Sequence, residues 1–145
     1  MARYRFGLTL LAVLAGCAAQ SGTPVPFAAQ GDAIPAALAA YGDPERGRAI
    51  IAGRDANCVL CHVVPGTDPR TVGDLAPPLA GVASRLTRGQ MRLRIVDSTR
   101  LNPGTIMPSY YRVEGLNRVA AQWRGKPILT AQEVEDVIAY LETLR

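Results

Sequence analysis

Two cysteines and a histidine within five residues, Cys58-Val59-Leu60-Cys61-His62, constrain the fold of this chain more than any other feature. The thiols lie one helical turn apart, so both sulfur atoms can reach one edge of a porphyrin and form thioether bonds to its two vinyl groups. The adjacent imidazole of His62 can then bind the iron as the proximal ligand. We therefore expect one covalently attached haem, held by Cys58 and Cys61, and a core that folds around it.

Residue counts weigh against the other sites that a Cys-x-x-Cys pair can build. A structural zinc ion needs four ligands, whereas the chain holds three cysteines and one histidine. The third cysteine, Cys17, lies far upstream in an apolar leader. A redox-active dithiol is expected within a βαβ unit, and no such pattern follows the pair. These counts favour covalent haem attachment. A chance occurrence of the five residues is the remaining alternative.

Residues 1–16 have the pattern of an export signal peptide, in which two arginines precede an apolar run over residues 6–15. That run is shorter than the about 20 residues that a membrane-spanning helix needs. The sequence Leu14-Ala15-Gly16-Cys17 resembles the lipobox of bacterial lipoproteins, which implies that Cys17 carries a lipid and becomes the new amino terminus. Cleavage after a small residue such as Ala19 is the alternative. Both interpretations predict a periplasmic protein. Under the first of them, the lipid anchor is its only contact with a membrane.

The charge of the exported chain gives no support for a nucleic-acid partner. The whole sequence carries 16 basic and 12 acidic side chains, a net charge of +4. Loss of the two leader arginines leaves 14 basic residues against 12, or +2, and the two propionates of a haem would cancel that charge. The roughly 128 residues that remain are enough for one domain.

Composition and capping signals divide the rest of the chain into a tether and an all-α domain. Residues 17–42 are rich in alanine, proline and glycine, so we expect a flexible tether with at most a short helix over 34–40. Residues 43–145 form the predicted domain, without the alternation typical of strands. Prolines and glycines exclude long regular structure over 64–81. The predicted helices, three of them preceded by the caps Asp43, Thr87 and Thr130, cover residues 44–52, 87–99, 116–123 and 131–144.

The second axial ligand follows from the scarcity of donors. His62 is the only histidine, so two histidines of one chain cannot bind the iron. Met91 falls on a predicted helix as a packing residue. Met107 lies in the loop 103–108, whose prolines stiffen the backbone on both sides, and we predict it as the distal ligand. A packing role for Met107, ligation by the only lysine, Lys126, and an open sixth position are the alternatives.

The pentad, the Met107 loop and the helix order resemble class I cytochrome c over residues 43–145. In that family a proline carbonyl downstream of the pentad accepts a hydrogen bond from the proximal histidine. The resemblance implies this role for Pro77, and packing of Leu79 on the haem ring, although Pro77 and its neighbour could serve only a turn. It also implies that the first and last helices cross at four residues, Gly47, Ile51, Val137 and Tyr140.

A narrower resemblance connects the chain with SoxX, the mono-haem subunit of the SoxAX cytochrome complex of sulfur-oxidising bacteria. It rests on four stretches, which cover residues 89–103, 105–111, 116–120 and 125–130. The resemblance implies an electron-transfer subunit of an L-cysteine S-thiosulfotransferase complex. The bond between thiosulfate and the carrier SoxYZ would form on the partner subunit SoxA. This chain would then accept the electrons and pass them to a soluble cytochrome.

Two other functions and one surface feature stay open at the level of sequence. The chain could be an independent, lipid-anchored electron carrier between respiratory complexes, or a redox or gas sensor with a labile sixth ligand. Arg85, Arg88 and Arg92 fall on one stripe of the second long helix. The stripe could dock a partner, be an ordinary solvated face or lie near a haem propionate.

Overall fold

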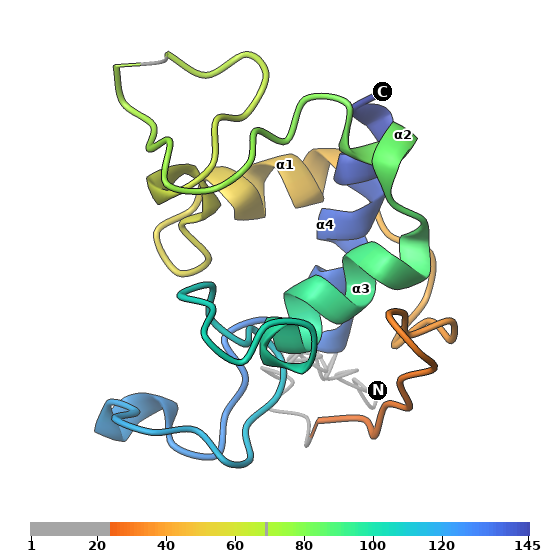
Figure 1. Ribbon diagram of the computed structural model, residues 1–145, viewed down its shortest axis with the longest axis vertical. Coiled ribbons are helices and arrows are strands. Elements are labelled where there is room, and N and C mark those ends of the chain that lie inside the picture. Colours follow the sequence, from red (N-terminus) through yellow and green to blue (C-terminus); the bar gives the residue numbers. More distant parts are fainter. Residues whose placement is uncertain (1–23, 69) are drawn as a thin grey trace, which may run out of the picture.

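Three helices form the frame of the molecule, in a computed structural model that describes residues 24–68 and 70–145. Helix α1 (Pro44–Ala52) crosses α4 (Ala131–Thr143), and α3 (Arg88–Asp97) packs on another part of α4 (Figure 1). The short helix α2 (Val82–Arg85) contacts the carboxyl end of α4. The predicted signal peptide and Cys17 lie outside the described residues. Within the described ranges there are only two isolated β-bridges and no strand, so the all-α class predicted from the sequence is confirmed.

Local capping explains where the long helices begin. The Thr130 and Glu133 side chains exchange hydrogen bonds with each other's backbone, and Thr87 and Gln90 do the same at the start of α3. The Asp43 carboxylate accepts a hydrogen bond from the Arg46 backbone, ahead of a proline at the first position of α1. These three helix starts agree with the sequence predictions. A 3₁₀ turn, η2 (Ser98–Arg100), extends the end of α3.

Two of the weaker helix predictions were wrong, and one short helix was missed. Residues 34–40 form bends instead of a helix, and the predicted helix over 116–123 is reduced to the 3₁₀ turn η3 (Ala121–Trp123). Helix α2 lies just beyond the proline- and glycine-rich stretch and has no side-chain cap. Short segments without caps depend on tertiary contacts for their conformation, which their sequence patterns do not reveal.

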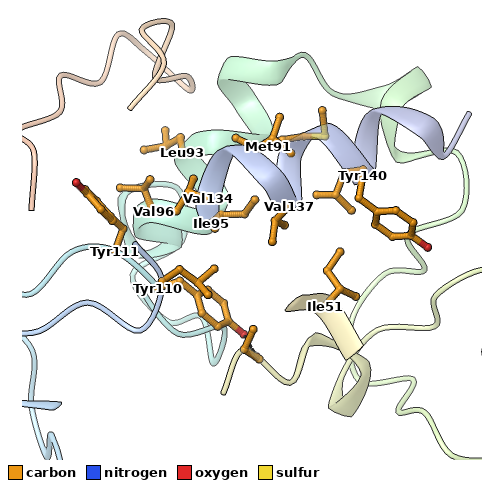
Figure 2. Packing of buried hydrophobic residues seen from close by; sticks show 14 of the residues in the cluster. Ile51, Met91, Leu93, Ile95, Val96, Tyr110, Tyr111, Val134, Val137 and Tyr140 are labelled. Atoms are coloured by element: carbon orange, nitrogen blue, oxygen red, sulfur yellow. Dashed lines mark hydrogen bonds between the residues drawn. The ribbon is translucent and has the colours of Figure 1, made fainter. Parts of the chain in front are cut away.

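The crossing of α1 and α4 depends on Gly47. A Cβ atom at this position would lie 1.9 Å from the carbonyl oxygen of Asp136 and 2.9 Å from the Tyr140 Cβ. Only glycine therefore allows the two backbones to come this close. Ile51 of α1 and Val137 of α4 are buried at the same crossing (Figure 2). The helix crossing implied by the resemblance to class I cytochrome c is present.

The core lies between α3 and α4 and extends to the chain that follows the Met107 loop. The buried side of α3 includes Met91, which was predicted as a packing residue, together with Ile95 and Val96. These residues lie opposite residues of α4 in Figure 2. Tyr110 and Tyr111 close the same cluster from the loop side. Among the residues that the structure describes, no helix combines the length and the apolar character needed to cross a membrane.

The described part of the predicted tether is packed on the domain. Ile34 is 1% exposed and Leu38 is 8% exposed. The Leu38 backbone N–H donates to Glu135 Oε1 at 3.0 Å, and Arg92 Nη1 donates to the Ile34 carbonyl at 2.7 Å. The expectation of a free tether is therefore wrong for residues 24–42. Few apolar side chains suffice here because buried charged groups of the domain bind the backbone of the segment.

Two of the three arginines of the predicted stripe, Arg88 and Arg92, do not form a solvated surface. Arg92 is 2% exposed and forms a bidentate ion pair with Glu135 of α4, with N–O distances of 2.7 and 2.8 Å. Arg88 lies 3.4 Å from Glu142 and stacks over the Tyr41 ring. Arg88 and Arg92 therefore face the acidic side of α4, and their charges are neutralised within the chain. Arg85 lies on α2 instead, where it is exposed and donates to the carbonyl groups of Pro78 and Ala80.

Candidate haem site

The Cys58–His62 pentad adopts a tight turn that brings its side chains to one cavity. The 3₁₀ turn η1 (Cys58–Leu60) begins after Asn57, which has a left-handed backbone with a φ of 45°. Asparagine tolerates that conformation better than most residues. The Cys58 carbonyl accepts hydrogen bonds from the backbone N–H groups of Cys61 at 3.2 Å and His62 at 3.0 Å. Cys58, Cys61 and His62 consequently line the same cavity.

A second segment fixes the orientation of the His62 ring. His62 Nδ1 lies 2.7 Å from the carbonyl oxygen of Pro77, the acceptor named from the sequence. Backbone hydrogen bonds from Ala76 to Cys61 and from Leu79 to Val63, each 2.9 Å, hold this segment beside the pentad. The Pro77 contact assigns the proton to Nδ1 and leaves Nε2 with a free lone pair, as an iron ligand requires.

Two neighbouring cavities meet at His62 and Met107. Their volumes are about 240 and 550 Å³, and both are lined by His62, Pro77, Thr105 and Met107. The smaller cavity contains the two cysteines and Tyr110, whose hydroxyl donates to the Ala56 carbonyl at 2.9 Å. The two cavities therefore adjoin at these shared residues, next to the pentad.

The larger cavity has the lining that a porphyrin needs. Most of its wall is apolar and includes the residues Leu79, Val82, Leu86, Met91, Ile95 and Leu141. Arg85 and Arg94 are cationic members of the same wall, where they can face the carboxylates of an otherwise apolar ring. Thiols, an oriented imidazole, a thioether and apolar walls together fit a covalently bound haem.

The surroundings of Cys58 do not favour a reactive thiol. Burial is the main cause that raises the pKa of the Cys58 thiol to about 11. Before a thioether forms, the group is therefore protonated at neutral pH, whereas metal ligation and nucleophilic attack require the thiolate. This environment suits attachment to haem better than zinc binding or thiol exchange.

The structure separates Met107 from the other candidate ligands. Met107 is half-buried and lines both cavities. Met91 is 2% exposed within the α3 core and lines only the larger of the two. Lys126 is exposed and borders a different cavity, with Trp123 on its wall. The geometry therefore brings Met107 and His62 to one site and leaves Lys126 outside it.

A polar network behind the Met107 loop was missed by the sequence analysis. Asp97 is 3% exposed, and burial by itself would raise the pKa of its carboxyl group. Hydrogen bonds from Thr99 and Ser109 and the charge of Arg112 outweigh burial and hold this pKa below its usual range. Asp97 is therefore ionised at neutral pH. No sequence pattern indicated that these residues meet.

Comparisons with known proteins agree with this site. The family model for cytochrome c matches residues 44–145. The crystal structure of SoxXA from P. pantotrophus contains a similar chain, with a TM-score of 0.74 and 37% sequence identity over 81% of this chain and 93% of that chain. A search of the curated proteins found no match. The chain resembles a SoxXA subunit and carries the attachment motif for covalent haem c, and it belongs to the cytochrome c family.

Proposed function

We propose that this chain is the electron-transfer subunit, equivalent to SoxX, of a SoxAX-type complex. The observation that carries the proposal is the similarity to a chain of SoxXA at 37% identity over 81% of the chain. This agrees with the SoxX-like stretches over residues 89–103 and 105–111. The haem pocket with His62 and Met107 gives the subunit the means to carry an electron.

In this proposal the residues of the pocket have separate roles. Cys58 and Cys61 would hold haem c through thioether bonds, and His62 and Met107 would be the ligands of its iron. The haem supplies one-electron redox chemistry when bound. The Pro77 carbonyl holds the His62 ring in one orientation through the 2.7 Å contact. With His62 and Met107 both serving as ligands, the site would favour electron transfer over the binding of small molecules.

The proposed partners follow from what this chain lacks. The two described cysteines both belong to the attachment pentad, so this part of the chain offers no free thiol for sulfur transfer. We place the joining of thiosulfate to SoxYZ on the SoxA subunit, with SoxYZ binding only transiently. The electrons released would pass through this chain to a soluble cytochrome. The chain is then a relay within a thiosulfotransferase complex and not the subunit that makes the bond.

An independent electron carrier is the second candidate, favoured by the lipobox that ends at Cys17. A lipid-anchored cytochrome could exchange electrons with several membrane complexes and need no dedicated partner. We propose a periplasmic location with an anchor at Cys17 for either function. The Cys17→Ser variant should leave the membrane fraction for the soluble periplasmic fraction, with its haem content unchanged. Continued membrane association of this variant would rule out the lipid anchor.

Purification from the native organism under mild conditions tests the two candidates. A SoxAX subunit should co-purify with a second haem-bearing protein in a fixed ratio, and the complex should join thiosulfate to SoxYZ. A monomer that exchanges electrons with several partners would contradict the SoxAX assignment and support the independent carrier. Binding of carbon monoxide to the reduced protein at neutral pH would instead support a sensor with an open iron.

A further inference from the structure

A buried carboxylate lies behind the loop that carries Met107. Asp97 is the last residue of α3 and is 3% exposed. Its Oδ1 accepts hydrogen bonds from the hydroxyls of Thr99 and Ser109, the latter at 3.1 Å. Its Oδ2 lies 2.9 Å from Arg112 Nε in an ion pair. The carboxylate therefore connects the end of α3 with the chain that follows Met107.

The next residue of the helix end binds Met107 itself. The Ser98 hydroxyl donates to the Met107 carbonyl at 2.9 Å, and Ser98 and Ser109 are only 6% and 8% exposed. The Tyr110 backbone N–H donates to the Ile95 carbonyl at 3.0 Å. The backbone at Met107 and just after it is thus fixed to the last turn of α3 by buried polar contacts.

These contacts matter because of the kind of ligand that Met107 provides. A thioether is uncharged and sits on a flexible side chain with three rotatable bonds. Its sulfur stays on a metal only where the surrounding backbone is held in place. The Met107 loop has no regular secondary structure before Pro108. Within the loop, the Thr105 N–H donates to the Asn102 carbonyl at 3.0 Å and the Met107 N–H donates to the Thr105 hydroxyl at 3.1 Å. The contacts with the end of α3 are the ones that hold this loop to the helical frame.

We infer that Asp97 is a positioning residue for Met107. It holds the Met107 loop in place through its hydrogen bond with Ser109, while Ser98 binds the Met107 carbonyl. The inference rests on the proposed function, because it requires Met107 to be the distal ligand. Among the described residues that line the two haem cavities, Asp97 is absent, so it acts through the loop and not by contact with the haem. Loss of its charge would leave Arg112 without its carboxylate partner and weaken the hydrogen bonds that Thr99 and Ser109 donate to it.

The Asp97→Asn variant of the haem-loaded protein tests this role while keeping the size of the side chain. We expect the sulfur-to-iron charge-transfer band to lose at least about half of its intensity. Carbon monoxide should bind the reduced variant roughly tenfold more tightly, the change in an equilibrium constant expected from one lost hydrogen bond to a charged group. The reduction potential should fall, because methionine ligation raises it.

The Asp136→Asn variant is a matched control for a purely structural effect. Asp136 is also a buried aspartate, 2% exposed, and forms an ion pair with an arginine, Arg46, at 2.7 Å. It lies on α4 and its contacts are with α1 and with Gln132, so its substitution should lower stability and leave the band and the carbon monoxide affinity unchanged. Equal spectral effects in both variants would overturn the positioning role of Asp97.

The Ser109→Ala variant removes a single hydroxyl and decides the outcome if Asp97→Asn does not fold. It should weaken the band in the same direction as Asp97→Asn but less. An unchanged band in Ser109→Ala and Asp97→Asn, with a band that disappears in Met107→Ala, would refute the positioning role alone. A band that persists in Met107→Ala would instead refute the proposed ligation, whatever Asp97 does.

Discussion

Met107 is the single residue on which the proposed iron ligation depends most directly. The structure brings it to the same cavities as His62, whereas Lys126 borders another cavity. Loss of a thioether ligand opens the sixth position and lowers the reduction potential. We therefore expect Met107→Ala to lose the sulfur-to-iron charge-transfer band completely and to bind carbon monoxide in its reduced state.

Optical spectroscopy and a redox titration of the purified Met107→Ala protein measure both effects. Met91→Leu is the matched control, since Met91 is buried in α3 and its packing role tolerates a similar apolar side chain. That control should keep the band and the potential of the parent protein. If Met91→Leu lost the band instead, the ligand would have been assigned to the wrong methionine.

The crossing of α1 and α4 makes a prediction at the scale of the helices. A methyl group at position 47 would lie 1.9 Å from the Asp136 carbonyl oxygen. The two helices would have to move apart to relieve this clash. We expect Gly47→Ala to lower the free energy of unfolding by about 3 kcal/mol, the upper part of the range for overpacking. Denaturant unfolding of the haem-loaded protein measures the change.

Gly104→Ala is the control for that measurement. The nearest atom to a Cβ at position 104 is the Asn102 side-chain oxygen, at an ordinary contact distance of 3.5 Å. This variant should unfold within about 0.5 kcal/mol of the parent protein. A loss of stability in Gly47→Ala no greater than in Gly104→Ala would show that the helices separate at little cost.

The contact between α1 and α4 should also make stability depend on pH. Burial alone would raise the pKa of Asp136, but hydrogen bonds from Arg46, the Asp43 backbone and Gln132, with the Arg46 charge, hold it below its usual range. A carboxyl group with a lowered folded-state pKa stabilises the fold above its unfolded-state pKa of about 3.9. That contribution disappears as the pH falls through the lower, folded-state value.

Denaturant unfolding of the parent protein and Asp136→Asn at several pH values tests this linkage. At pH 7 the variant should be less stable than the parent protein. The difference should shrink as the pH falls below about 4, because the parent carboxylate is then protonated as well. A difference that stays constant from pH 7 to the acid limit would contradict the assigned pKa direction.

The attachment of residues 24–42 to the domain concerns the whole molecule. Glu135 is 1% exposed, pairs with Arg92 at 2.7 Å and accepts the Leu38 backbone N–H at 3.0 Å. Breaking a buried ion pair from one side leaves the other charge without a partner. We expect Glu135→Gln to lower the free energy of unfolding by about 3 kcal/mol. It should also increase hydrogen exchange at residues 30–42, where the Ile34 and Leu38 backbone N–H groups are hydrogen-bonded to the domain.

Glu142→Gln provides the comparison, because Glu142 is only partly buried and pairs with Arg88 at 3.4 Å. A half-exposed pair contributes less than about 1 kcal/mol, and Leu38 does not depend on it. Unchanged exchange at residues 30–42 in Glu135→Gln would show that Ile34 and Leu38 hold the segment by apolar packing alone.

Local sequence patterns predicted the parts of this fold that depend on neighbouring residues. The capping boxes at Thr87 and Thr130 place the starts of α3 and α4, because each box is closed by residues three positions apart. The short helix over 34–40 and the length of the one near 116–123 were wrong, since neither has a cap and tertiary contacts set their conformation. The sequence also left the role of the arginine stripe open, although two of its residues, Arg88 and Arg92, bind acidic partners on α4.

The sequence by itself was enough to predict covalent haem attachment and the starts of the three long helices. The haem-site predictions rest on short stretches of sequence, namely the pentad at Cys58 with the single histidine and the prolines around Met107. Only the tertiary structure decided that residues 24–42 belong to the folded body and that Asp97 supports the Met107 loop. The Leu38–Glu135 bond joins residues 97 positions apart. Buried polar contacts over such distances depend on how the helices pack, and no local periodicity encodes that packing.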